Sequence, residues 1–234
     1  MAGRLPMNLL ERLLYRDGLM LIIDKPGGWV VYGAGAGGKN LEPLLTTLRF
    51  GLPRSPALVH RLDRGTSGCL ILGRHPKATR RLNRLFSEHR IEKRYWAMVH
   101  GKPPNDQGII DEPLREVEKS RTGPTMVVDP GGQPAITRYR LLDRVDRVSW
   151  LELMPITGRT HQLRVHCAYL GCSIIGDFRY GRDSGIPLHL HARQIIVPLH
   201  PNRPAIDVTA PPPGHLREWL TRMPNHREFL DDTP

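Results

Sequence analysis

Glycine and proline interrupt this chain at short intervals, a spacing that favours many short strands and turns over long helices. There are 23 glycines and 22 prolines among the 234 residues, whereas aromatic residues make up only 6%. The apolar and alternating runs between these breaks predict strands over residues 13–15, 19–24, 69–73, 94–100, 137–142, 149–154 and 194–199. Helices are expected over residues 41–50, 76–89, 160–170 and 216–222. This mixture, without an internal repeat or a linker, predicts one α+β domain over residues 1–234.

The chain carries a strong positive charge. Lys and Arg number 34 against 23 for Asp and Glu, which gives a net charge of +11. That balance is typical of proteins that bind polyanions, nucleic acid first and acidic membrane surfaces second, with a generically basic surface as the alternative. The odd set of Cys69, Cys167 and Cys172 argues against a disulfide scaffold and for a reducing compartment. With no apolar run near the ~18 residues of a membrane span and no signal-peptide core, we expect a cytoplasmic protein.

The densest polar cluster is HRLDRGTSG at residues 60–68, directly before the strand predicted over residues 69–73. Asp63 is flanked by Arg61 and Arg64, and nearby cations favour the ionised form of a carboxyl group. An ionised carboxylate can serve as a nucleophile, a general base or an electrostatic stabiliser. A salt-bridged structural turn is the alternative, because ion-pair networks gather the same residues.

A second cluster, TGRTHQLRVH at residues 157–166, opens the helix predicted over residues 160–170. Free amides at a helix N-terminus, together with arginine side chains such as Arg159, make an anion site. Arg164 can hold a phosphate there or pair with a buried carboxylate such as Asp63. A basic helix start without a ligand is the alternative.

The third cluster, KRYWAMVHG at residues 93–101, alternates like a strand, which predicts Tyr95 and Trp96 on opposite faces of a sheet. An aromatic ring beside basic side chains such as Lys93 can stack on an unpaired base. A place in the hydrophobic core is the commoner role of such aromatic residues.

The helix predicted over residues 76–89 has one basic face, because its cations recur at spacings of three and four at Lys77, Arg80, Arg81 and Arg84. The apolar residues lie roughly opposite and should face the core: Ala78, Leu82, Leu85 and Phe86. The basic face is either an RNA contact or a solvated surface. More basic residues follow at once and favour the RNA contact: Arg90, Lys93 and Arg94.

Metal, nucleotide and thiol chemistry are not favoured by the residue spacing. His161 and His166 form an H-x4-H spacing, and Cys167 and Cys172 form a C-x4-C spacing; neither matches a common zinc-binding pattern. For the pair His189 and His191, no third ligand is evident nearby in the sequence. The glycine-rich loop at residues 32–39 resembles a phosphate loop only in part, because Asn40 stands where Ser or Thr would hold magnesium. There is no recognisable catalytic cysteine and no G-x-S-x-G motif. We expect no metal and no cofactor.

Taken together, these clusters resemble the RluA-type family of RNA pseudouridine synthases. The resemblance rests on four segments in the family's order: KPGGWV at 25–30, HRLDRGTSG at 60–68, KRYWAMVHG at 93–101 and TGRTHQLRVH at 157–166. The last continues into GD at 176–177 and YG at 180–181, and the similarity covers about residues 13–211. It implies a curved, mostly antiparallel mixed sheet with flanking helices and loops, a central RNA cleft and no cofactor.

The resemblance also assigns roles to individual residues. Asp63 would be the catalytic aspartate, Arg164 its basic partner, and Tyr95 the tyrosine that packs on the uracil and assists proton removal. Arg61 would hold or replace the target base as that base leaves the stack. The implied reaction isomerises uridines to pseudouridine in structured RNA, which would be 23S ribosomal RNA, transfer RNA or both. The residues expected to contact RNA are Arg61, Arg64, Lys25, Lys93, Arg159, Arg80 and Arg84.

The family often carries an N-terminal S4 RNA-binding domain. Only about a dozen residues precede the first predicted strand here, so no S4 domain is expected. RNA capture would then fall to the catalytic domain, acting as a monomer without an obligate protein partner and without membrane contact.

Two functions of other classes stay open. A catalytically silent RNA-binding module would bind RNA and leave uridine unchanged. A carboxylate-dependent hydrolase acting on a glycosidic bond would release free uracil, and it would need a second acid at a fixed distance. Asp177 is the nearest candidate for that acid, although GDFRYG reads more simply as a turn.

Overall fold

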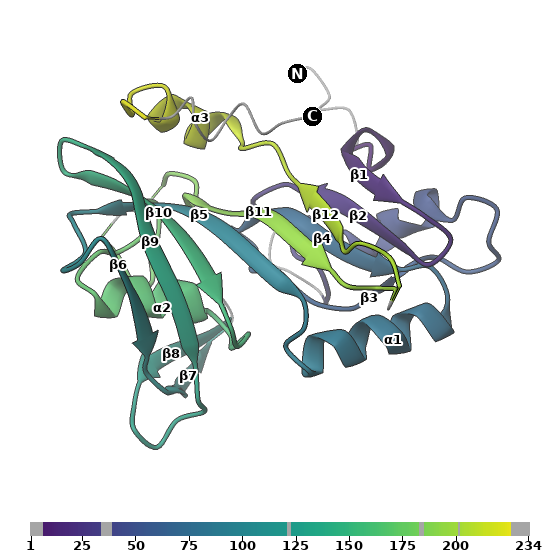
Figure 1. Ribbon diagram of the computed structural model, residues 1–234, viewed down its shortest axis with the longest axis horizontal. Helices are drawn as coiled ribbons and strands as arrows, with labels where there is room; N and C mark the ends of the chain where they lie inside the picture. The colour runs from purple at the N-terminus through teal and green to yellow at the C-terminus, as the bar shows by residue number, and fades with distance from the viewer. Residues whose placement is uncertain (1–6, 34–38, 121–122, 183–184, 201, 226–234) are drawn as a thin grey trace.

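Short strands provide most of the regular structure in the computed structural model, which describes residues 7–33, 39–120, 123–182, 185–200 and 202–225 (Figure 1). The strands are β1 (Leu13–Arg16), β2 (Met20–Lys25), β3 (Ala57–Leu58), β4 (Ser67–Gly73), β5 (Glu92–His100), β6 (Gln107–Asp111), β7 (Leu114–Ser120), β8 (Gly123–Val128), β9 (Ile136–Val145), β10 (Val148–Pro155), β11 (Leu190–Val197) and β12 (Ile206–Thr209). The helices are the 3-10 helices η1 (Leu10–Arg12) and η2 (Glu42–Leu48) and the α-helices α1 (Pro76–Ser87), α2 (Gln162–Tyr169) and α3 (Gly214–Leu220).

Ten strands form one mixed sheet in the order β1-β2-β4-β11-β5-β10-β9-β6, with β3 paired to β4 and β12 paired to β11. Every strand pairing is antiparallel except that of β4 with β11. β7 and β8 form a separate hairpin. Figure 1 shows β1, β2 and β4 in one half with α1, and β10, β9 and β6 in the other half with α2. The α+β fold on a mostly antiparallel mixed sheet is confirmed.

The parallel strands β4 and β11 approach each other closely at the junction of the two halves, and only glycine fits there. Gly68 pairs with Ala192, and a Cβ on Gly68 would lie 2.2 Å from the carbonyl oxygen of Ala192. The φ of +106° at Gly68 is also one that residues with a side chain rarely adopt. Ala192 pairs in turn with Tyr95 of β5. The loop before β4, which carries Asp63, and the Tyr95 end of β5 therefore meet at the centre of the sheet.

Different elements cover the two faces of the β2–β4 half. Leu82 and Leu85 of α1 pack into the cluster on one face, whereas Leu45 and Leu48 of η2 pack into the cluster on the other. The apolar positions predicted for α1 point into the core, and its four cations are exposed. The amphipathic helix is therefore confirmed, because burial of its apolar stripe fixes which face remains for water.

The same division holds in the half that contains β5 and β10. Ala97 and Val99 pack with Leu163 of α2, and Trp96 packs with Trp150 on the opposite face, beneath α3. The Trp96 and Trp150 rings meet edge to face with centroids 4.7 Å apart. Tyr95 belongs to the face of α2, so the predicted opposite orientation of Tyr95 and Trp96 is confirmed.

Strand β6 was not predicted from the sequence. It lies outside all of the segments that were predicted to be strands. It is an edge strand paired only with β9, and Ile109 is 63% exposed. Its burial pattern is therefore weak, and pairing with β9 rather than local sequence makes it a strand. Residues 34–38 of the glycine-rich loop predicted over 32–39 lie outside the described residues. Across the described ranges, no helix is both long and apolar enough to cross a membrane.

Candidate active site

The loop between β3 and β4 carries Asp63 and is fastened to the sheet by its neighbours. His60 Nε2 accepts a hydrogen bond of 2.9 Å from the amide of Ile71, and its ring stacks on Phe86 at 4.7 Å. Burial lowers the pKa of His60 to about 3, so this ring is neutral. Leu62 is also buried. The alternation of inward His60 and Leu62 leaves the Asp63 side chain on the open side of the loop.

Lys25 holds the same loop from behind. Its Nζ is completely buried and donates to the backbone carbonyls of Pro26, Trp29 and Arg64 at 3.0, 2.9 and 3.3 Å. Burial lowers the pKa of Lys25 to about 7, against the opposing charge of Asp63. The prediction that Lys25 contacts RNA is wrong, because an ammonium group that spends its three donors inside the protein presents nothing to a phosphate.

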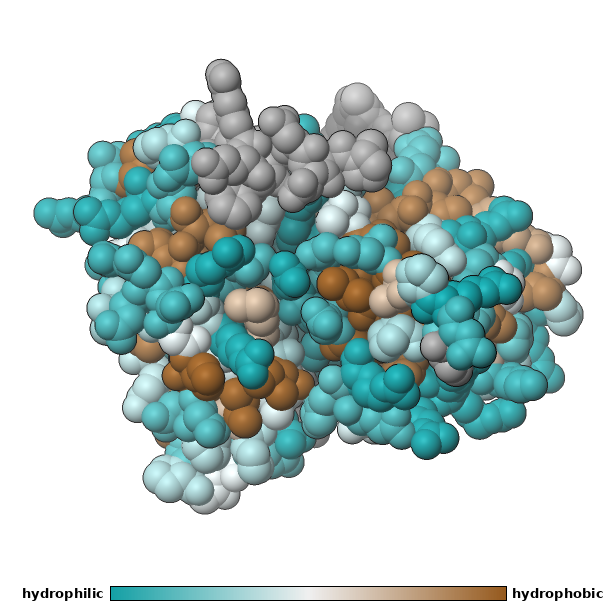
Figure 2. Space-filling model, in the orientation of Figure 1, coloured by the Kyte–Doolittle hydropathy of each residue, from teal (hydrophilic) through white to brown (hydrophobic). Residues whose placement is uncertain are grey.

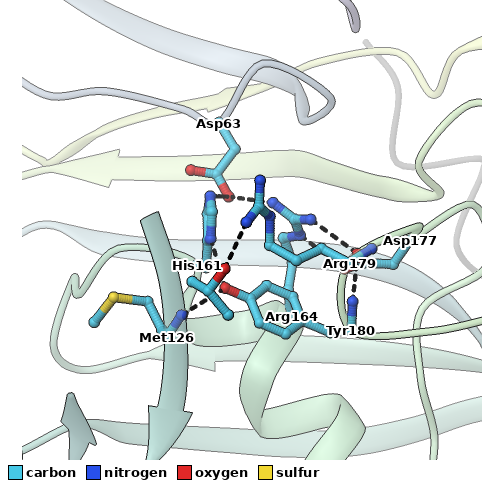
Figure 3. Close-up of polar contacts among 8 residues, drawn as sticks. Asp63, Met126, His161, Arg164, Asp177, Arg179 and Tyr180 are labelled. Atoms are coloured by element: carbon cyan, nitrogen blue, oxygen red, sulfur yellow. Dashed lines mark hydrogen bonds and ion pairs between the residues drawn. The ribbon is translucent and has the colours of Figure 1, made fainter. Parts of the chain in front are cut away.

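Two side chains from the start of α2 reach the Asp63 carboxylate. Arg164 Nη1 lies 3.6 Å from Oδ2, and His161 Nε2 lies 3.9 Å from the same oxygen. Figure 3 shows both groups on one side of the carboxylate, with the other oxygen free of drawn contacts. The Asp63 side chain keeps 17% of its surface exposed. One carboxylate oxygen therefore faces two basic side chains, and the Asp63 side chain lies at the cleft with part of its surface exposed.

Arg164 is itself fixed by a second carboxylate. Its Nε and Nη2 donate to Asp177 Oδ2 and Oδ1 at 2.7 and 2.8 Å, and Oδ1 also accepts from the amides of Arg179 and Tyr180. The predicted pairing of Arg164 with Asp63 is present, but the bidentate partner is Asp177. Burial raises the pKa of Asp177, and the hydrogen bonds and charge of Arg164 outweigh it and hold that pKa below 3.8. Asp177 is thus ionised, and the hydrolase alternative loses its acid.

Tyr95 faces the same region from β5. Its ring is partly buried and packs against the clusters of both halves of the sheet. Burial, and next the charge of Asp63, raise the pKa of the Tyr95 hydroxyl. The phenol therefore stays protonated at neutral pH and offers an aromatic face next to a carboxylate.

The Asp63 loop borders an open cleft of about 1700 Å³, whose lining does not include Tyr95. Asp63, His161 and Arg164 lie at its wall, and exposed apolar side chains, among them Phe178 with 64% of its surface free, line it as well. Its arginines come from separate loops and helices: Arg12, Arg61, Arg64, Arg164, Arg179 and Arg217. A partly exposed carboxylate, surrounded by arginines and aromatic surface, suits a nucleotide of a polyanionic chain.

Residues 19–169 match the family described as RNA pseudouridylate synthase. The chain belongs to this family. An uncharacterised RNA pseudouridine synthase of Zymomonas mobilis is 44% identical over 193 residues, which cover 80% of this chain and 88% of that protein. The ribosomal large subunit pseudouridine synthase C of Vibrio cholerae is 35% identical over 221 residues, which cover 90% of this chain and 69% of that protein.

A solved structure is also similar. The human RNA Pseudouridylate Synthase Domain Containing 4 matches with a TM-score of 0.76 and 28% identity, covering 92% of this chain and 93% of that one. The resemblance to RluA-type RNA pseudouridine synthases is confirmed, and so is the family fold. The protein is an isomerase that converts uridine in RNA to pseudouridine.

Within this pseudouridine synthase, the structure brings together only part of the residues predicted to contact RNA. Arg61 and Arg64 share the cleft with Asp63. Lys93 is partly buried on β5, and its charge acts on His60. Arg159 is exposed at the start of α2, where its Nε donates to the carbonyl of Pro134. Neither Lys93 nor Arg159 lines the cleft.

The basic face of α1 lies away from the cleft and borders a second groove of about 380 Å³. Arg84 lines this groove, and Arg80 does not. Arg203 and His200, from the segment after β11, join the groove with residues of α1 and the turn that follows it: Arg81, Leu85, Glu88 and Arg90. Hydrophilic side chains cover the region of α1 in the space-filling view (Figure 2). A basic surface built from two distant parts of the chain replaces the single helix face predicted from the sequence.

Sequence reasoning gave no role to His161 or Tyr180, although both contribute to the site. His161 was considered only as a metal ligand, and the described residues contain no group of three or more His, Cys, Asp or Glu side chains placed to hold a metal ion. The sequence feature that could have indicated a role for both residues is the TGRTHQLRVH motif, which contains His161, together with its continuation around Asp177 and Tyr180. The contact of His161 with Asp63 depends on a fold that places residues about a hundred positions apart side by side.

Proposed function

We propose that the ionised carboxylate of Asp63 starts the isomerisation at the ribose of an extruded uridine. During the reaction the N1–C1′ bond breaks, a C5–C1′ bond forms, C5 loses a proton and N1 gains one, so no cosubstrate is needed. The observation that carries this assignment is the asymmetry of the carboxylate. One oxygen faces Arg164 and His161, and the other makes no contact with the residues drawn in Figure 3. Whether the oxygen adds to C1′ or removes a ribose proton, the ionised form is required.

Two neighbours of Asp63 have supporting roles in this proposal. Arg164 holds Asp63 in place through the contact of 3.6 Å, because its own position is set by Asp177. Tyr95 packs on the uracil ring. Its raised pKa keeps the phenol protonated at neutral pH, so the hydroxyl is not free to accept the C5 proton. We therefore assign the aromatic face to binding, and the C5 proton leaves with the help of water.

RNA enters the cleft with the target base flipped out, which costs a few kcal/mol of lost stacking and pairing. We assign Arg61 and Arg64 to the RNA backbone and to the gap left by the base, because both are exposed beside Asp63. Phosphate contacts of this kind offset the unstacking cost and make binding depend on salt. Lys93 and Arg159 remain predicted contacts for RNA that extends beyond the cleft.

We infer that the substrate is large-subunit ribosomal RNA. The supporting observation is that relatives covering most of this chain are described as ribosomal large subunit pseudouridine synthase C. The three buried free cysteines fit the reducing cytoplasm where ribosomes are assembled. Mapping pseudouridines in total RNA from cells with and without the protein tests the assignment. Loss of a site in transfer RNA alone would overturn it.

The test of Asp63 is the variant Asp63→Asn, which keeps the size of the side chain and removes its charge. Turnover on uridine-containing RNA should fall by about 10²–10⁴-fold, while RNA affinity stays within about twofold because phosphate contacts dominate binding. Asp111→Asn, at an exposed position of β6, is the matched control. Products are read as pseudouridine, uridine or free uracil after digestion. Substantial pseudouridine from Asp63→Asn would refute the assignment, and free uracil from the wild type would support a hydrolase.

We further propose that the groove beside α1 binds the phosphate backbone of RNA outside the cleft. Arg81→Glu with Arg203→Glu should weaken RNA binding and reduce the slope of log affinity against log salt by about 1–2. Arg144→Glu with Arg147→Glu, two exposed positions at the turn between β9 and β10, changes the net charge equally. If both pairs weaken binding to the same extent, the effect belongs to net charge, and the groove is a solvated surface.

A further inference from the structure

The His161 side chain lies between Asp63 and Tyr180, and its backbone has a left-handed conformation that residues with a side chain rarely adopt. His161 immediately precedes α2 with φ 55° and ψ 14°, in the left-handed region. Its ring is nearly enclosed, with Nδ1 2.7 Å from the hydroxyl oxygen of Tyr180 and Nε2 3.9 Å from Asp63 Oδ2 (Figure 3). The left-handed conformation thus sets one ring between two functional groups.

The contact between Tyr180 and His161 is compatible with either tautomer of the imidazole, and the Asp63 carboxylate distinguishes the two. The amide of Met126 donates to the Tyr180 oxygen at 3.0 Å, so that oxygen acts as an acceptor there. The phenol has one proton to donate, and among the described residues its hydroxyl also contacts His161 Nδ1. If the phenol donates to Nδ1, the proton of a neutral imidazole sits on Nε2 and points toward Asp63. The reverse arrangement would turn the Nε2 lone pair toward a carboxylate.

We propose that Tyr180 and His161 form a positioning relay for Asp63. The phenol fixes the imidazole with its proton on Nε2, and Nε2–H acts with Arg164 Nη1 on Oδ2, which leaves Oδ1 turned to the substrate. The inference rests on the proposed role of Asp63 and adds two residues that act through Asp63. His161 and Tyr180 are therefore positioning residues, and their loss should reduce turnover more than substrate binding.

The relay requires a neutral imidazole, since a charged one would compete with the substrate for the carboxylate. Burial lowers the pKa of His161, and the charge of Asp63 opposes that shift. The other ionised groups that act on the ring are Arg164 of α2 and the pair Arg179 and Asp177 from the segment after it. Donation from the Tyr180 phenol to Nδ1 disfavours protonation there as well. Removing the hydroxyl should therefore raise the pKa of His161 and move the acid limb of turnover to higher pH.

The first experiment compares Tyr180→Phe with Tyr169→Phe. Tyr169 lies on the exposed side of α2, and its hydroxyl donates to Glu112 at 2.9 Å. Tyr180→Phe should lower kcat about tenfold, the effect of one lost hydrogen bond, with KM within twofold and the acid limb displaced upward. Nitrogen NMR of labelled histidine should show the proton on Nε2 in the wild type and a mixture in Tyr180→Phe. A wild type protonated on Nδ1 would overturn the proposal.

The second experiment remains decisive if Tyr180→Phe folds poorly. His161→Gln places an amide N–H near the position of Nε2–H, whereas His161→Leu does not, and both substitutions meet the same left-handed backbone. The Gln variant should retain several times the kcat of the Leu variant at equal KM. Equal kcat values for the two variants would overturn the proposal of a relay. If the relay fails while Asp63→Asn is inactive, the proposed function stands; an active Asp63→Asn would overturn both.

Discussion

Replacing Asp177 with Asn removes one charge from the support of the active site and changes almost nothing in shape. The Asp177 side chain is fully buried, and Arg164 meets it through two hydrogen bonds of 2.7 and 2.8 Å. An asparagine oxygen can still accept from the amides of Arg179 and Tyr180, which now donate to Oδ1. The turn is therefore preserved, while the guanidinium of Arg164 loses its bidentate charge partner and keeps the longer contact of 3.6 Å with Asp63.

The expected cost follows from the charge that stays behind. Removing one partner of a buried ion pair destabilises a protein by about 3–5 kcal/mol, because the other charge is left without compensation. Asp177→Asn and Arg164→Met should each lower the free energy of unfolding by that amount. The double variant carries neither charge, so its loss should stay near that of one single variant. The coupling energy between Arg164 and Asp177 is then about 3 kcal/mol.

Urea unfolding at pH 7, followed by tryptophan fluorescence, measures all four proteins, and equal m-values show that the same surface is exposed in each. Losses that add within about 0.5 kcal/mol in the double variant would refute the reasoning, since additivity means that the two groups are independent. The dependence of stability on acidic pH provides a second test. Because Arg164 holds the pKa of Asp177 below 3.8, this stabilisation is complete above that pH and disappears as pH falls through the folded-state pKa. The double variant should lack that acid-dependent loss.

Two further predictions concern the frame around Asp63. Burial lowers the pKa of Lys25 from 10.5 to about 7, so the unfolded chain binds more protons between these pH values and stability rises with pH there. From pH 7 to 9, urea unfolding should show a rise about 2 kcal/mol larger for the wild type than for Lys25→Met; equal slopes would contradict a buried, depressed Lys25. Gly68→Ala should cost about 3 kcal/mol or more in the same assay, because its Cβ would meet the Ala192 carbonyl. Gly158→Ala, with open space around it, should stay within about 0.5 kcal/mol, and similar losses for both would refute the packing argument.

The sequence predicted best those elements whose pattern is local. α1 was recognisable because its cations and apolar residues recur at helical spacing, and burial follows that spacing. β4 was recognisable as a short apolar run. The edge strand β6 and the hairpin of β7 and β8 lack such a pattern, and they form because a partner strand supplies hydrogen bonds. Helices and strands could thus be predicted where the sequence shows a periodic or apolar pattern. They could not be predicted where the element depends on pairing with another strand.

The site was predictable at the level of motifs and not at the level of contacts. Asp63 and Arg164 were expected to meet, and they do at 3.6 Å. Lys25 was expected to face RNA, because a lysine in a motif beside glycine and proline carries no sign of its burial. The Asp177 carboxylate was read as a turn or an acid, since its bidentate partner lies thirteen positions earlier on another element. Contacts of this kind depend on the tertiary fold, and no regular pattern in the sequence indicates them.

The cations of this enzyme divide into two sets that act on different steps. Lys25 and Arg164 are buried on either side of the Asp63 loop and bond to carbonyls or a carboxylate, whereas Arg61 and Arg64 are exposed. Dissolved ions screen exposed charges over about 8–10 Å but reach buried pairs far less. We therefore expect salt to affect the proposed RNA contacts of Arg61 and Arg64 more than the contact between Asp63 and Arg164. This separation lets a strongly basic surface vary with its RNA partner without altering the charge balance on which the chemistry depends.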